Sequence, residues 1–264
     1  MRRRLLSLLL AVAAGSFSGL PGEAQILPGG LGGQRADPPC VLDKCLGLKP
    51  NTPTPTTPTQ SPDAEQSAGR STSVAPGSFD FYVLALSWSP GFCASGGAAK
   101  SPDQCAAGAN PGFVVHGLWP QNQHGYPQAC NSGARFPSRL ALDSAKGVYP
   151  DEGLARHEWR QHGTCSGKSP TDYFADVRRA RQAIVIPPEL TAPDADQTWA
   201  PLDIARSFVT ANPRLRTDTM AVTCRGNALE EVRICFSKDL RSFVPCPEVA
   251  RASCRRPVTV PAGH

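Results

Sequence analysis

The sequence has no run of about 18–20 apolar residues, the length that a membrane-spanning helix requires. It has no Asn-x-Ser/Thr sequon, so N-glycosylation is not expected. Its formal net charge of +5 is modest and argues against a heavily basic coat for nucleic acid. Ten cysteines in 264 residues are too few for a scaffold without a hydrophobic core and too many for an ordinary cytosolic chain. These limits point to an exported protein with one domain and appendages.

The first 24 residues have the pattern of a secretory signal peptide. Three arginines at positions 2–4 precede a short apolar segment (5–14), and residues 22–24 resemble a cleavage site. The apolar segment is too short to cross a bilayer. We therefore expect a secreted or periplasmic protein, and in such a compartment disulfides are the default state of cysteine.

Composition divides the rest of the chain. The segments are a Gly/Pro-rich extension with Cys40 and Cys45 (25–49), a Pro/Thr-rich linker (50–78), a globular domain (79–257) and a tail (258–264). The linker is too poor in apolar residues to offset the entropy cost of folding, which predicts disorder. From residue 78 onward, 20 basic and 17 acidic residues leave a net charge of +3, which allows a polyanionic substrate without requiring one.

The hydrophobic pattern of the domain predicts a mixture of strands and helices. Strands are expected over 79–88, 113–115, 217–224 and 229–236. Helices are expected over 137–146, 151–161, 202–210 and from the cap Ser169 to the stop at Pro187. Because the elements do not alternate strictly as strand and helix, we predict an α+β fold.

Histidines are concentrated where chemistry is expected, since four of the five lie between positions 116 and 162. His116 follows the apolar strand at 113–115 and precedes Gly117, which predicts a place at a strand end facing a cleft. A buried structural histidine is the alternative. On a helix at about 100° per residue, His157 and His162 bracket a polar arc that contains Glu158. That arc is either a site or a solvated helix face.

A metal site is the less favoured interpretation of the second segment. The helix of zinc proteases carries its two histidines four residues apart, whereas His157 and His162 are five apart. With Glu158 and a third ligand a metallo-hydrolase remains an alternative. A thiol nucleophile is disfavoured because an even number of cysteines in an exported protein indicates pairing.

Two segments together carry a family resemblance. His-Gly-Leu-Trp-Pro (116–120) and His-Glu-Trp-x-x-His-Gly-Thr-Cys (157–165) resemble the active-site segments of the ribonuclease T2 family, and we expect a bacterial member of it. The resemblance covers about residues 79–255. It implies a central antiparallel sheet with flanking helices, stapled by the disulfides Cys93–Cys105, Cys130–Cys165, Cys224–Cys254 and Cys235–Cys246. A local Cys40–Cys45 pair is an expectation from proximity alone.

The resemblance also implies a reaction. The family cleaves single-stranded RNA by attack of the 2′-hydroxyl on the adjacent phosphorus, which gives a 2′,3′-cyclic phosphate. By resemblance His162 is the base, His116 the acid, and His157 binds the phosphate, while Glu158 orients these groups. No metal or cofactor is implied because the nucleophile belongs to the substrate, and DNA, which lacks the 2′-hydroxyl, is not cleaved. We expect a monomer.

Base recognition is predicted from aromatic and amide side chains. Trp119 matches a family position that contacts the upstream base, although core packing is the alternative for a tryptophan. Gln121 and Tyr126 are further candidates for base contacts. His124 matches no family position and is expected in a surface loop.

Gln161 departs from the family pattern, which has lysine before the second helical histidine. A neutral amide supplies no charge to the phosphorane, and loss of one such donor costs on the order of 10²–10³ in rate. Arg160 is about 100° round the helix and compensates only if its side chain reaches back. A weakly active or inactive RNA-binding or toxin-like relative is therefore the alternative to an active endoribonuclease.

Overall fold

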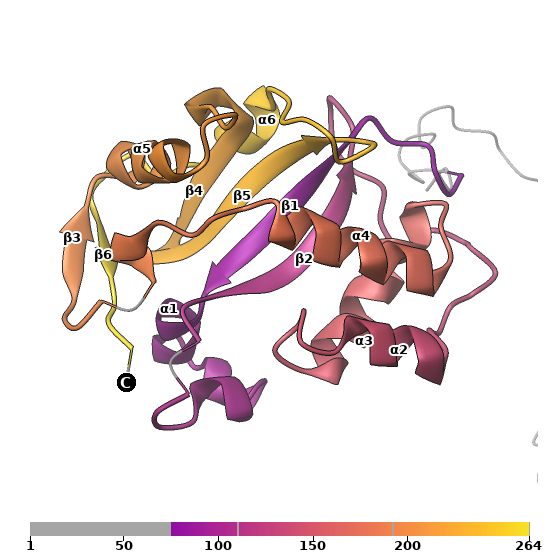
Figure 1. Cartoon of the computed structure of the whole chain (residues 1–264), viewed down its shortest axis with the longest axis horizontal. Coiled ribbons are helices and arrows are strands. Elements are labelled where there is room, and N and C mark those ends of the chain that lie inside the picture. Colours follow the sequence, from indigo (N-terminus) through magenta and orange to yellow (C-terminus); the bar gives the residue numbers. More distant parts are fainter. Residues whose placement is uncertain (1–74, 110, 192, 264) are drawn as a thin grey trace, which may run out of the picture. The chain divides into compact units, whose positions relative to one another are not determined.

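The computed structural model describes residues 75–109, 111–191 and 193–263. The predictions for the signal peptide, the extension with Cys40 and Cys45, and all but the last residues of the linker lie outside these ranges. The arrangement of the helices and strands is shown in Figure 1.

The strands of the described part form one sheet in the order β2-β1-β5-β6-β3, with β4 also paired to β5. They are β1 (Phe81–Trp88), β2 (Phe113–Gln121), β3 (Gln197–Trp199), β4 (Met220–Arg225), β5 (Ala228–Ser237) and β6 (Val258–Val260). The helices are α1 (Ser89–Ala94), α2 (Arg139–Ala145), α3 (Glu152–Gln161), α4 (Pro170–Gln182), α5 (Pro201–Ala211) and α6 (Pro247–Ala250). The α+β class is confirmed. The sheet is antiparallel except where β5 and β6 pair in parallel.

Helices cover one face of this sheet. Figure 1 shows α4 lying across β1 and β2, and α5 across β4. Alternate residues of β1, such as Leu84 and Leu86, are fully buried there with Phe174 of α4 and Phe208 of α5. Each such side chain contributes roughly 1.5–3 kcal/mol on burial, so this face supplies most of the hydrophobic stabilisation.

The opposite face of the sheet is partly buried as well. Val232, Ile234 and Phe236 of β5 are buried on the helix-covered face, and Glu231 and Cys235 on the other face are also buried. Cys235 packs there with Phe81 and Val83 in a small second cluster. This face of β5 is therefore not solvated, because a disulfide and a polar site cover it.

Local signals place the helices close to the predicted positions. The side chain of Asp151 accepts a hydrogen bond from the Leu154 backbone N–H (2.8 Å) and starts α3. Ser169 caps α4 in the same way, with Pro170 at the first helical position, as predicted. The predicted strand over 217–224 begins only at Met220, because its first residues form a 3₁₀ turn.

Four disulfides join the cysteines of the described part. They are Cys93–Cys105, Cys130–Cys165, Cys224–Cys254 and Cys235–Cys246, the pairs that the resemblance implies. The Cys130–Cys165 bond ties the segment after β2 to the turn that follows α3. It therefore connects the two sequence segments that carry the histidines.

The predicted end of the domain at residue 257 is wrong. Val258 and Val260 are buried in β6, which pairs with β3, and the Pro261 carbonyl accepts a hydrogen bond from the Trp88 indole (3.0 Å). The domain also begins before residue 79, since the Gly77 N–H donates to the Cys165 carbonyl (2.8 Å). The final strand was missed because three residues are too few to show a hydrophobic pattern.

Candidate active site

His116 occupies a β-bulge in the middle of β2. Strand pairing with β1 joins Ala85 to Gly117 and Leu86 to Val115, which leaves His116 without a partner. The expected position at a strand end is therefore wrong, because β2 continues to Gln121. A bulge places an extra residue in one strand and redirects its side chain.

The bulge brings His116 and Trp119 to the same face of the sheet. Side chains three residues apart in a regular strand point to opposite faces. Here Val115 and Leu118 are buried on the helix-covered face, while His116 and Trp119 are half-buried on the other. The one-residue shift in strand pairing thus places His116 and Trp119 together on one polar surface of the sheet.

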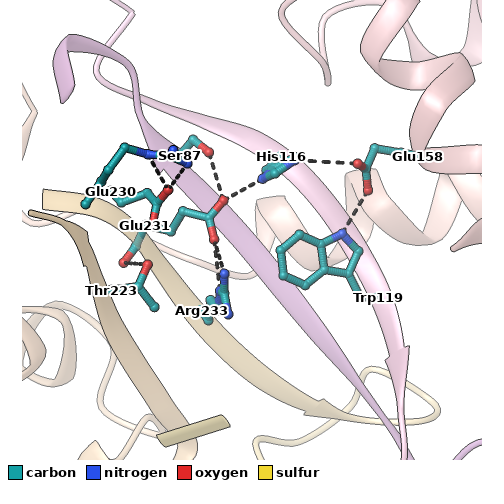
Figure 2. A network of polar contacts seen from close by, with 9 residues as sticks. Ser87, His116, Trp119, Glu158, Thr223, Glu230, Glu231 and Arg233 are labelled. Atoms are coloured by element: carbon teal, nitrogen blue, oxygen red, sulfur yellow. Dashed lines mark hydrogen bonds and ion pairs between the residues drawn. The ribbon is translucent and has the colours of Figure 1, made fainter. Parts of the chain in front are cut away.

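Glu158 projects from α3 toward this surface. Its side chain is 1% exposed, so it does not belong to a solvated helix face. The Trp119 indole N–H donates to Glu158 Oε2 (2.8 Å), and Glu158 Oε1 lies 3.6 Å from His116 Nε2 (Figure 2). A Cβ on Gly117 would collide with Glu158 Oε2 and Trp119 Nε1, so only glycine allows this hydrogen bond. Trp119 is therefore anchored at the site by Glu158, while its half-buried ring also packs against the small second cluster.

His162 lies just beyond the helix that carries Glu158. It is the C-terminal cap of α3 with non-helical backbone angles, so placing it on a continuous helix was wrong. Its backbone N–H donates to the Glu158 carbonyl (2.9 Å). His157 is within α3 and is partly exposed.

An indole separates two of the imidazoles. The Trp119 ring centre is 5.3 Å from that of His116, in an edge-on arrangement, and 5.3 Å from that of His162. The structure therefore brings together all four residues to which the resemblance assigns catalytic roles, with His116 and Glu158 in direct proximity and His162 across the indole.

The pKa values of His116 and His162 are shifted in opposite directions. Burial alone would lower the pKa of His116, but the hydrogen bond and charge of Glu231, together with the charge of Glu158, raise that pKa above its ordinary value of 6.5. Burial lowers the pKa of His162 to about 3, and the charges of His116 and His157 act in the same direction. His162 Nδ1 has no hydrogen-bond partner among the described residues, which disfavours the imidazolium further.

Burial also shifts the pKa values of Glu158 and His157. Burial raises the pKa of Glu158 to about 7, opposed by the charge of His116 and the hydrogen bond from Trp119. The pKa of His157 is lowered by burial and by the nearby charge of Arg160. Arg160 therefore acts on His157 electrostatically, although no hydrogen bond joins the two.

Sequence reasoning missed Glu231 and Arg233 of β5. Glu231 Oε1 accepts from His116 Nδ1 (2.5 Å), and Arg233 Nε donates to Glu231 Oε2 (2.9 Å). The Arg233 guanidinium also lies over the Trp119 ring, 5.1 Å from its centre. The available signal was the presence of charged residues at alternate positions, 231 and 233, within a predicted strand.

Two cavities border the site. The larger, about 610 Å³, is lined by His116 and His157 together with the basic side chain of Lys100. The smaller, about 390 Å³, is lined by side chains suited to stacking on and hydrogen-bonding a base: Trp119, Gln121, Tyr126, Gln128, His162 and Arg233. The structure thus gathers the three predicted base-contact residues in one cavity.

Gln161 and His124 occupy more exposed positions. Gln161 is the last residue of α3, and its Oε1 accepts a hydrogen bond from Gln128 Nε2 (3.0 Å), which leaves the Gln161 amide group as a donor. The His124 side chain is 94% exposed and lies outside the site, as expected of a surface loop.

The donor set for a metal is poor in the part of the chain that the structure describes. It contains no group of three or more His, Cys, Asp and Glu side chains positioned to hold a metal ion. Glu158 is engaged by Trp119 and faces His116, so it does not converge with His157 and His162 as metal ligands do. No described helix is long and apolar enough to cross a membrane.

The profile described as "Ribonuclease T2 family" matches residues 79–246. The chain belongs to the ribonuclease T2 family. A ribonuclease of Aeromonas hydrophila is 47% identical over 109 residues, which are 40% of this chain and 48% of that protein. Ribonuclease DdI of Dictyostelium discoideum is 29% identical over 207 residues, which are 71% of this chain and 86% of that protein.

A solved structure shares the fold of this chain. A variant of RNase MC1 from bitter gourd seeds superposes with a TM-score of 0.56 at 21% identity, covering 68% of this chain and 97% of that one. The match to the Aeromonas protein spans about half of its length. Both curated relatives are named ribonucleases, so the comparisons identify a ribonuclease domain and give no support to the inactive alternative.

Proposed function

We propose that this ribonuclease domain cleaves single-stranded RNA by transphosphorylation. The 2′-oxygen attacks the adjacent phosphorus, the bond to the 5′-oxygen breaks, and a 2′,3′-cyclic phosphate forms. The observation that carries the proposal is the pair of imidazoles on either side of Trp119, one neutral because it is buried and one protonated because carboxylates face it. A reaction that removes one proton and delivers another needs such a pair.

The environments fit the two roles. His162, with its pKa lowered to about 3, is in the neutral form across the mildly acidic range and takes the proton of the 2′-hydroxyl. His116, with its pKa raised, carries the proton that the departing 5′-oxygen needs. The step leaves His162 protonated and His116 neutral. Hydrolysis of the cyclic phosphate moves the protons back, with His116 as base and His162 as acid, whereas after release of the cyclic phosphate the two imidazoles exchange protons with water.

Positioning falls to the neighbouring groups. Glu158 holds Trp119 and faces His116, which sets the separation of the acid and the base. His157 lines the cavity that also contains His116 and contacts the phosphate. Gln161 donates its amide N–H₂ toward the phosphoryl oxygens, in the place where the family has a cation.

The substrate is single-stranded RNA because bases must be unstacked to enter the cavities. A variant of RNase MC1 was crystallised with 5′-UMP, which fits a nucleotide-sized site in this fold. In this chain Trp119 and Tyr126 stack on a base, and Gln121 donates or accepts at its edge. The enzyme acts without a metal or cofactor, as a monomer exported from the cell.

The test is an end-group assay. Purified protein is incubated with RNA oligomers and with DNA of the same sequence, each with and without chelator. Cyclic phosphate ends on RNA in the presence of chelator, with intact DNA, support the proposal. Sensitivity to chelator or cleavage of DNA contradicts it, and the variants H116A and H162A are expected to lose activity by at least about 10³-fold.

A further inference from the structure

Glu231 is a carboxylate buried beneath the site. Its side chain is 4% exposed and comes from β5, a strand that carries neither of the two histidine-containing segments. Figure 2 shows Ser87, His116 and Arg233 converging on it. Desolvation strongly disfavours a buried carboxylate unless its oxygens are paired, so the contacts of Glu231 require an explanation.

The acceptors of Glu231 are divided between two kinds of donor. Oε1 accepts from Ser87 Oγ (3.1 Å) and His116 Nδ1 (2.5 Å). Oε2 accepts from Arg233 Nε (2.9 Å) and forms an ion pair with Nη2 of the same guanidinium (2.8 Å). One oxygen thus faces the imidazole and the other is neutralised by a guanidinium, so the carboxylate remains ionised while it binds the ring.

Resting on the proposed function, we propose that Glu231 is the positioning residue of the general acid His116. By accepting the Nδ1–H, it fixes the ring orientation and leaves Nε2 as the nitrogen that delivers a proton to the departing 5′-oxygen. Nε2 makes no hydrogen bond among the described residues and lies 3.6 Å from Glu158 Oε1.

The proton balance follows from this arrangement. When the phosphorus–oxygen bond to the 5′-oxygen breaks, the Nε2 proton moves to that oxygen and the imidazolium becomes a neutral imidazole. The other proton stays bonded to Nδ1 and hydrogen-bonded to Glu231. Glu231 does not take up this proton because Arg233 stabilises the negative charge of the carboxylate. The ring is therefore returned in the tautomer that can accept a proton again at Nε2.

Other charged groups facing His116 do not replace Glu231. Glu158 of α3 is too far from Nε2 for a hydrogen bond and is engaged by Trp119. The positive charge of Arg233 opposes protonation of the His116 ring, and protonated His157 repels the protonated ring as well. The net preference for the protonated ring therefore depends mainly on Glu231.

The experiment compares two leaving groups. A dinucleotide releases an alkoxide that needs an acid, whereas a nucleoside 3′-(4-nitrophenyl phosphate) releases a phenolate that does not. We expect Glu231→Gln to lower kcat/KM about 10²-fold on the dinucleotide and less than about threefold on the activated ester. His116→Ala is expected to show the same selectivity, whereas His162→Ala lowers both rates.

A matched control separates positioning from stability. Asp176 of α4 is also a carboxylate with 3% exposure, paired with Lys168 and Arg179. Asp176→Asn removes a buried charge away from the site, so it is expected to reduce thermal stability while affecting both substrates equally and little. Glu231→Asp, which keeps the charge, is expected to recover part of the dinucleotide rate.

Nuclear magnetic resonance gives a second readout. In the wild type the short hydrogen bond to Glu231 is expected to produce a far-downfield proton signal on His116 Nδ1, which is lost in Glu231→Gln. Equal losses on both substrates would overturn the positioning role alone. If the wild type cleaves neither substrate, the proposed function itself is wrong, and the positioning role is overturned with it.

Discussion

The indole nitrogen of Trp119 donates a 2.8 Å hydrogen bond to the buried carboxylate of Glu158. This bond joins β2 to α3, two elements that each carry part of the site. Because the same indole lies between His116 and His162, the carboxylate that fixes it also sets the distance between the two imidazoles.

The first prediction concerns Gly117. The space that a Cβ would need at this position is occupied by the side chains of Trp119 and Glu158. We expect Gly117→Ala to break their hydrogen bond and to lower kcat about 10–100-fold, because small displacements of catalytic groups are costly. Trp119→Phe removes the same donor without a clash. If the glycine acts through this bond, the double variant is no slower than the worse single variant. Additive losses, or unfolding seen by circular dichroism, contradict this explanation.

The second prediction is the pH dependence of kcat/KM. The base His162 loses its neutral form only as the pH falls toward about 3, since its pKa is lowered by burial. The acid His116 loses its proton as the pH rises above 6.5, because its pKa is raised. The profile is therefore a bell with a broad acidic side and an alkaline limb above pH 6.5. A rate that rises steadily to pH 9 contradicts the paired roles.

The third prediction concerns Gln161. We expect Gln161→Lys to raise kcat on RNA at least about tenfold with the same cyclic product, because a cation stabilises the phosphorane better than an amide. The lysine gives up the hydrogen bond from Gln128, which is exposed and worth little. Gln161→Glu, of nearly the same shape and opposite charge, is expected to be slower than the wild type. No gain from lysine would show that the site has adapted to the amide.

The fourth prediction concerns the Cys130–Cys165 disulfide, which closes a sequence separation of 35. Replacing both cysteines with alanine is expected to lower the free energy of unfolding by about 3–4 kcal/mol through loop entropy. The activity also falls, since the Ala129 N–H donates to the Gln161 carbonyl beside His162.

The matched control for that variant is the Cys224–Cys254 pair, with a separation of 30. Its removal is expected to cost a similar free energy of unfolding, measured by chemical denaturation. Measured at a temperature where both variants are folded, kcat should fall only for the Cys130–Cys165 variant. Equal kcat values for the two variants would show that the first bond contributes stability alone.

Much of the fold could be predicted because it depends on local signals. The caps Asp151 and Ser169 act within one helical turn, so such signals can be recognised in the sequence. The final strand, β6, was missed because it has three residues and is stabilised by pairing with β3, far away in sequence. His162 was misplaced because a helix end depends on the turn and disulfide that follow it.

By itself the sequence determined the family, the disulfide partners that the family implies, and the identity of three histidines and one glutamate. Only the tertiary structure decided how these groups meet. The bulge at His116 arises from the register between β1 and β2, and it alone puts His116 and Trp119 on one face. Glu231 reaches His116 across 115 residues of sequence. Strand register is a non-local property, so no pattern along the chain encodes either contact.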